Sequence, residues 1–118
     1  SLADCYGILC EMGGPVEEMM AGGGGGTSPL WRQMLADMFG CTVSAASSKE
    51  GAALGAAILA GVGAGLFPSV PEACRRFIKA DKSCAPIPEN HDFYAKAHPL
   101  YQKLYTDLKE DYQALAAL

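Results

Sequence analysis

The sequence is poor in the features that nucleic-acid binding, metal binding and disulfide formation require. Its 118 residues carry 9 basic and 13 acidic side chains, a net charge of −4 at pH 7, with the basic residues scattered. No nucleic-acid surface is therefore expected. The two histidines, His91 and His98, have only Asp92 near them, so we expect solvent-exposed histidines and no metal site. The five cysteines include no Cys-x-x-Cys pair, which favours reduced thiols and a cytoplasmic protein.

Lysine is absent before Lys49. The Walker phosphate-binding loop requires a lysine next to a serine or threonine, so the sequence excludes that loop. The Gly-x-Gly-x-x-Gly fingerprint of dinucleotide-binding proteins also fails, because Thr27, Ser28 and Pro29 occupy its third glycine position in the three possible frames. Any nucleotide site here must use another motif.

Charged side chains are absent from residues 51–70, a stretch long enough to span a bilayer. It consists mostly of glycine and alanine, reaches Pro68 near its end and has no basic flank. We therefore expect a buried helix and no membrane interaction. Its small residues would let this helix pack closely against a sheet or another helix.

Glycine is abundant, and the run Gly22–Gly26 lies between a short apolar segment and a capped helix. Glycine has no Cβ, so the backbone can adopt positive φ and a ligand can approach it closely. Ser28 suits the N-cap and Pro29 the first helical position, which predicts a helix whose unpaired N–H groups face the loop. The pattern indicates a cradle for a phosphate or nucleotide, with a flexible surface turn as the alternative.

The remaining pattern predicts an α/β fold with a small sheet of parallel strands. The expected elements are a helix over residues 2–12, a buried strand over 16–21, a helix over 29–39, a strand over 41–45, a helix from a Ser47–Glu50 capping box, a shorter helix over 70–78, a loop over 81–89 and a long terminal helix.

One proline and several aromatic residues allow further predictions about the helices. Pro99 should kink or split the terminal helix, because proline lacks a backbone donor and clashes with the preceding turn. Trp31 is expected at the core or rim, with stacking on a purine as the alternative. A stripe of tyrosines is expected to pack against the rest of the chain; its members are Tyr94, Tyr101, Tyr105 and Tyr112.

Three segments in order, residues 15–40, 49–60 and 63–69, together with the tyrosine-rich end, resemble the FGGY carbohydrate kinases, and most closely their xylulokinase members. The resemblance implies the ribonuclease-H-like ATPase fold shared with actin and hexokinase. It also implies that residues 1–118 are part of the C-terminal, nucleotide-binding lobe, with the N-terminal lobe absent. Strands that lack their partners would leave an open edge, so we expect self-association.

The activity implied by this resemblance is transfer of the ATP γ-phosphoryl group to a sugar hydroxyl with Mg²⁺, most closely conversion of D-xylulose to D-xylulose 5-phosphate. Gluconate, ribulose, glycerol or another polyol are alternative substrates, and a non-enzymatic helical interaction module is a second alternative. The family's catalytic aspartate and sugar-binding residues fall outside this chain. No catalytic or metal-binding residue is therefore assigned, Asp37 is not taken as the base, and the fragment alone is expected to be inactive.

The resemblance does carry a nucleotide site onto the glycine run. Gly23, Gly24, Gly25 and Gly26 match the family's adenosine loop, and Ser28 matches the position that faces the adenine edge. Many relatives have alanine in place of Gly26 and a basic residue in place of Thr27. We expect ATP to bind at Gly23, Gly24, Gly25, Gly26, Thr27 and Ser28 through backbone donors.

Overall fold

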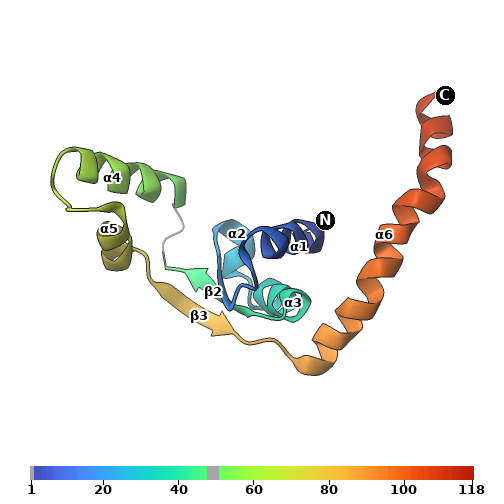
Figure 1. Ribbon diagram of the computed structural model, residues 1–118, viewed down its shortest axis with the longest axis horizontal. Coiled ribbons are helices and arrows are strands. Elements are labelled where there is room, and N and C mark those ends of the chain that lie inside the picture. The colour runs from blue at the N-terminus through green and yellow to red at the C-terminus, as the bar shows by residue number, and fades with distance from the viewer. Residues whose placement is uncertain (1, 48–50) are drawn as a thin grey trace.

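The computed structural model describes residues 2–47 and 51–118. Helices alternate with three short strands (Figure 1). The elements are α1 (Leu2–Gly13), β1 (Glu18–Ala21), α2 (Gly23–Thr27), α3 (Pro29–Phe39), β2 (Thr42–Ala46), α4 (Gly51–Gly63), α5 (Val70–Phe77), β3 (Ala80–Cys84) and α6 (Pro88–Ala116).

The sheet has the order β1-β2-β3. β1 and β2 pair in parallel, with Met19 opposite Val43, which confirms the predicted parallel pair and the α/β class. β3 pairs antiparallel to β2, so the predicted loop over residues 81–89 is wrong in its first part. β3 is an exposed edge strand with the sequence Ala-Asp-Lys-Ser-Cys, and its polar side chains give no apolar alternation from which a strand could be read.

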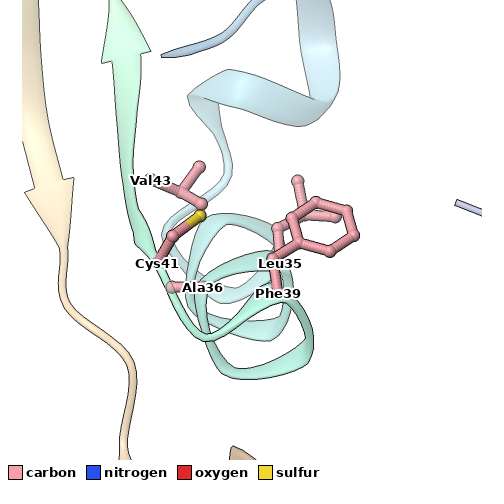
Figure 2. Close-up of a cluster of buried hydrophobic side chains, with 5 residues drawn as sticks. All are labelled: Leu35, Ala36, Phe39, Cys41 and Val43. Carbon is pink, nitrogen blue, oxygen red and sulfur yellow. The ribbon is translucent and has the colours of Figure 1, made fainter. Parts of the chain in front are cut away.

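The core lies between α3 and β2. Its buried side chains gather on one side of β2, as Figure 2 shows; they are Leu35, Ala36, Phe39, Cys41 and Val43. Tyr6 stacks on Phe39 with ring centroids 4.7 Å apart and so joins α1 to this cluster. Burial raises the pKa of Tyr6 to about 12 and also raises that of Cys41, so both groups stay protonated at neutral pH.

Capping residues begin and end the helices where the sequence indicates. The Ser28 hydroxyl accepts the Trp31 N–H at 3.3 Å at the start of α3, and Gly40 ends α3 with a left-handed φ of 68°. Ser69 caps α5 by accepting the Glu72 N–H at 3.4 Å. The predicted Ser47–Glu50 capping box falls partly outside the described residues, because residues 48–50 are not described.

Several elements are more exposed than the sequence predicts. β1 alternates between exposed and half-buried residues instead of being buried, and α4 buries only Ile58 and Gly61 instead of lying in a core. Tyr101, Tyr105 and Tyr112 are exposed, so the expected packing of the tyrosine stripe is wrong for them. The cause is a lack of neighbouring chain, because α4, α5 and the end of α6 extend away from the core (Figure 1).

The size of the molecule agrees with this open arrangement. Its radius of gyration is 18.6 Å, whereas a compact domain of this length would have one of about 13.5 Å. Within residues 2–47 and 51–118, no helix is both long and apolar enough to cross a membrane.

α6 runs without a break through Pro99, so the predicted split of this helix is wrong. The residues around Pro99 are largely exposed, and the carbonyl that loses its partner can bind water.

Asp37 fastens the first turn of α6 to α3. Its carboxylate is 3% exposed and accepts the Ile87 N–H at 2.8 Å, the Asn90 amide at 2.7 Å and the Gln33 amide at 2.7 Å. Burial raises the pKa of Asp37, but these donors outweigh it and leave the pKa below its ordinary value of 3.8. The carboxylate therefore has a structural position, in which it joins α3 to the start of α6.

The two histidines are half-buried, so the expectation of solvent-exposed histidines is wrong. The His91 ring lies over Gly40, and its Nδ1 is 2.8 Å from the Asp37 carbonyl oxygen. His98 Nε2 lies 3.0 Å from the Asp4 carboxylate, between α6 and α1. Contacts with residues distant in sequence hold both rings, at the end of α3 for His91 and on α1 for His98, and the local sequence around either histidine contains no sign of them.

We predict that Asp37→Ala lowers the free energy of unfolding by about 2–4 kcal/mol, because three donors lose a charged acceptor. Chemical denaturation at neutral pH measures this change. The matched control is Asp107→Ala, which removes an exposed ion pair with Lys103 and should change stability by less than about 0.5 kcal/mol.

The same carboxylate makes stability depend on pH. Because its folded pKa lies below 3.8, its contribution is present above that value and is lost as the pH falls through the folded pKa. Between about pH 5 and about pH 3 the wild-type chain should lose more stability than Asp37→Asn. Equal losses would contradict the position given to Asp37.

Candidate functional site

The glycine turn, residues 22–28, follows β1 and precedes α3. It lies at the carboxyl ends of the parallel strands β1 and β2, the edge at which α/β sheets bind ligands. Gly22 to Gly25 and Thr27 are exposed, Ser28 is half-buried and Gly26 is buried. The turn is therefore open to a ligand from solvent.

The turn is more regular than a flexible surface turn, the alternative that the glycines left open. Gly23–Thr27 form the short helix α2, which begins after Gly22 and ends at Ser28. Within the turn only Gly23 has a positive φ, of 67°, and this position requires glycine for conformational reasons. The run thus has a defined backbone, although five glycines alone predict none.

Three successive carbonyl groups of the turn are engaged inside the chain. The Gly24 carbonyl accepts the Thr27 hydroxyl at 2.8 Å, and the Gly25 carbonyl accepts the Ser28 N–H at 3.2 Å. The Gly26 carbonyl accepts Nη1 of Arg32 at 2.6 Å. The first N–H groups of a helix have no acceptor within it. The turn therefore has spare donors and few spare acceptors, which suits a ligand with acceptor atoms or negative charge.

The glycines of the turn differ in what a side chain at each position would contact. A Cβ on Gly26 would lie 2.3 Å from the Ala21 carbonyl oxygen, so the turn packs directly on the end of β1. A Cβ on Gly25 would lie 3.0 Å from the Trp31 indole. A Cβ on Gly24 would meet nothing within 4 Å. Packing inside the chain thus explains Gly26 and Gly25, whereas only something outside it would explain Gly24.

The side chains of the turn are used mainly for its own geometry. The Thr27 hydroxyl is bound to Gly24 and the Ser28 hydroxyl caps α3, so both hold backbone in place. Trp31 is 42% exposed and lies against Gly25, which places it at the rim as predicted. Sequence reasoning missed Arg32, which is 3% exposed beneath the turn. The available signal was a basic residue four positions after the helix cap.

A shallow pocket adjoins the turn on the side of α4. Its volume is about 260 Å³, and most of its lining is apolar; the lining residues are Met20, Gly22, Ala46, Ser47, Gly51, Leu54, Gly55 and Ile78. The pocket brings the ends of β1 and β2 together with the start of α4. An apolar cavity beside spare N–H donors is a common form of small-ligand site.

Comparison with known proteins gives consistent results. The profile of the FGGY family of carbohydrate kinases, C-terminal domain, matches residues 1–64. An autoinducer-2 kinase from Salmonella choleraesuis (strain SC-B67) is 40% identical over 100 residues, which are 85% of this chain and 19% of that protein. A xylulose kinase from Staphylococcus epidermidis is 34% identical over 110 residues, which are 93% of this chain and 22% of that protein. The chain spans about a fifth of the length of these relatives.

Solved structures agree with the fold. The ligand-bound xylulose kinase from Lactobacillus acidophilus superimposes with a TM-score of 0.81 and 25% identity, covering 97% of this chain and 24% of that one. The gluconate kinase from the same organism gives a TM-score of 0.77 and 28% identity, covering 84% of this chain and 20% of that one. The α/β arrangement is thus the one found in part of these kinases.

The contacts of the turn predict opposite effects for one substitution at two neighbouring positions. Gly26→Ala should lower the free energy of unfolding by about 1–3 kcal/mol, because the new methyl group would overlap the Ala21 carbonyl. Gly24→Ala should leave stability unchanged or raise it by up to about 1 kcal/mol, because the position is open and has an ordinary φ. Denaturant unfolding measures both, and a change in the same direction would contradict this packing.

Proposed function

The chain belongs to the FGGY family of carbohydrate kinases, and we propose that residues 1–118 form the adenosine-binding part of the C-terminal lobe of such a kinase. The observation that carries the proposal is the exposed glycine turn: three of its carbonyls are bound within the chain, and the first N–H groups of α2 have no acceptor within that helix. The chain covers about a fifth of its curated relatives. We accordingly assign the N-terminal lobe to a part of the protein outside this sequence.

The proposed reaction is transfer of the γ-phosphoryl group of ATP to a sugar hydroxyl, most closely that of D-xylulose to give D-xylulose 5-phosphate, in the cytoplasm. Such transfers depend on positioning and on stabilising the charge of the phosphates. This chain would hold the nucleoside end. The base and the sugar pocket would lie elsewhere, because Asp37 is buried and fully engaged with α6. The fragment alone should therefore be inactive.

Nucleotide binding would use both parts of the site. In the proposed arrangement the N–H groups of Gly23, Gly24 and Gly25 donate to acceptor atoms of the nucleotide, and the purine lies in the apolar pocket between Met20 and Leu54. Gly26, Thr27 and Ser28 complete the site by fixing the backbone. Among the described residues, no three His, Cys, Asp or Glu side chains gather as a metal site. We therefore assign Mg²⁺ to the triphosphate and to residues outside this chain.

The identity of the sugar is the less constrained part of the proposal. The relatives include kinases named for xylulose, autoinducer-2 and gluconate. Ribulose, glycerol or another polyol also fits the family. Xylulose is proposed because both a curated relative and a solved structure that cover more than nine-tenths of this chain are xylulose kinases. A helical interaction module without activity remains the alternative if the turn binds no nucleotide.

Gly24→Val tests the site directly. The side chain should block the approach of a nucleotide to the turn and weaken ATP binding at least about tenfold, measured by calorimetry on the 118-residue chain. The fold should be retained, because nothing lies within 4 Å of the new Cβ. The matched control is Gly63→Val, which is equally open and lies at the end of α4. Unchanged ATP affinity in Gly24→Val would refute the proposed role of the turn.

We also propose that the isolated chain self-associates. β1 is an edge strand whose outer side has no partner among the described residues, and Met20 on it is 43% exposed. Open edges with apolar side chains favour pairing between chains, and an inserted charge discourages it. Light scattering should give a mass above the 12.3 kDa of one chain, and Met20→Lys should shift it toward that value. A monomeric wild-type chain would contradict this proposal.

A further inference from the structure

Arg32 is a buried cation directly beneath the glycine turn. Its side chain is 3% exposed, and Nη1 donates to the Gly26 carbonyl at 2.6 Å. Nε is buried without a hydrogen-bond partner. No carboxylate in the described ranges forms an ion pair with this guanidinium. Arg32 is thus charged, desolvated and held by a single neutral acceptor.

Such an arrangement is a poor way to stabilise a fold. Removing a guanidinium from water is costly, and one carbonyl does not repay that cost. Apolar residues of similar volume often replace buried charges without loss of stability, and sometimes with a gain. The presence of a charge at this position therefore calls for a reason other than packing.

The contact with Gly26 supplies that reason. Gly26 is also the glycine that packs on the Ala21 carbonyl, so the peptide is fixed from two sides. With the Gly26 carbonyl held toward Arg32, the neighbouring peptide planes of α2 keep one orientation. The charge also lies under the turn, where it adds to the positive potential of the spare N–H groups.

We infer that Arg32 is a positioning residue of the nucleotide site: its guanidinium holds the Gly26 carbonyl inward, which fixes the donors of the turn and places a positive charge behind them. The inference rests on the proposed function for its ligand, a nucleoside triphosphate. The positioning itself is a property of the free chain and can be measured without ligand.

The test compares Arg32→Met with Arg32→Lys in the 118-residue chain. Methionine fills the space without charge or donor, so thermal unfolding should stay at the wild-type temperature or above it. The ¹⁵N order parameters of the Gly23 to Gly26 amides, measured by NMR, should fall from about 0.85 to about 0.6 or below, while those of the α3 amides stay near about 0.85. Binding of Mg²⁺-ATP, measured by calorimetry, should weaken at least about tenfold. Lysine keeps a positive charge and an N–H donor, so Arg32→Lys should recover part of the order of the turn and part of the ATP affinity.

Arg75→Met is the matched control, because Arg75 is exposed on α5 and the same substitution there should change none of these quantities. Unchanged order parameters at Gly23 to Gly26 in a folded Arg32→Met chain would overturn the inference whether or not ATP binds. A lower unfolding temperature with lower order parameters throughout α3 would also overturn it, because Arg32 would then be an ordinary structural residue. If the wild-type chain binds no ATP while Arg32→Met still loosens the turn, the proposed function fails and the positioning contact stands.

Discussion

Parallel pairing of β1 with β2 determines where the other features of this chain lie. Two neighbouring parallel strands need a crossover, and here the crossover consists of the glycine turn followed by α3. The turn must therefore begin at the carboxyl end of β1, and α3 must return across the sheet, where it buries Leu35 and Phe39 against Val43. The same pairing that makes the core also brings the turn to the edge of the sheet where ligands bind.

The site and the core share α3, but they use opposite ends of it. The first turn of α3 contributes Ser28 as cap and Arg32 beneath the glycines. Its last turns contribute Asp37, which binds the start of α6, and Gly40, which lies under the His91 ring. A short helix thus connects the glycine turn, the proposed nucleotide site, to the C-terminal helix through side chains of fixed position. The family assignment agrees with the open arrangement, since these relatives are more than four times as long as this chain.

Local chemistry made part of this structure predictable. Ser28, Pro29 and Gly40 mark the bounds of α3 because capping depends on neighbouring residues alone, and Ser69 does the same for α5. The turn itself was found from the glycines, although its short helix was not. Contacts between distant residues gave no such signal. β3 forms because β2 has a free edge, and Asp37 is engaged because residues 85–91 fold back onto it.

The exposure of α4 and of the tyrosine stripe could not be predicted for a related reason. Residues 51–70 contain no charged side chain, which is typical of a buried helix. An apolar pattern shows which face a helix can bury, but it does not show whether a partner is present to cover that face. Arg32 is the opposite case. Its charge predicts a position at the surface, but the structure buries it. Its burial follows from the close approach of the turn to β1, which Gly26 permits.

The attachment of α6 has a mechanical consequence. The helix is held at its first turn by Asp37 and farther along by a hydrogen bond from Gln102 to Asp4, and every residue from 101 onward is exposed. From Gln102 to the end of the helix at Ala116 the rod extends about 21 Å at 1.5 Å per residue. A tilt of about 10° at that second support would move the far end by about 4 Å. The first turn of α6, at Pro88, lies about 21 Å from Gln102 on the other side of that support, so the helix transmits a movement at the Asp37 carboxylate to its far end at about equal size and in the opposite direction.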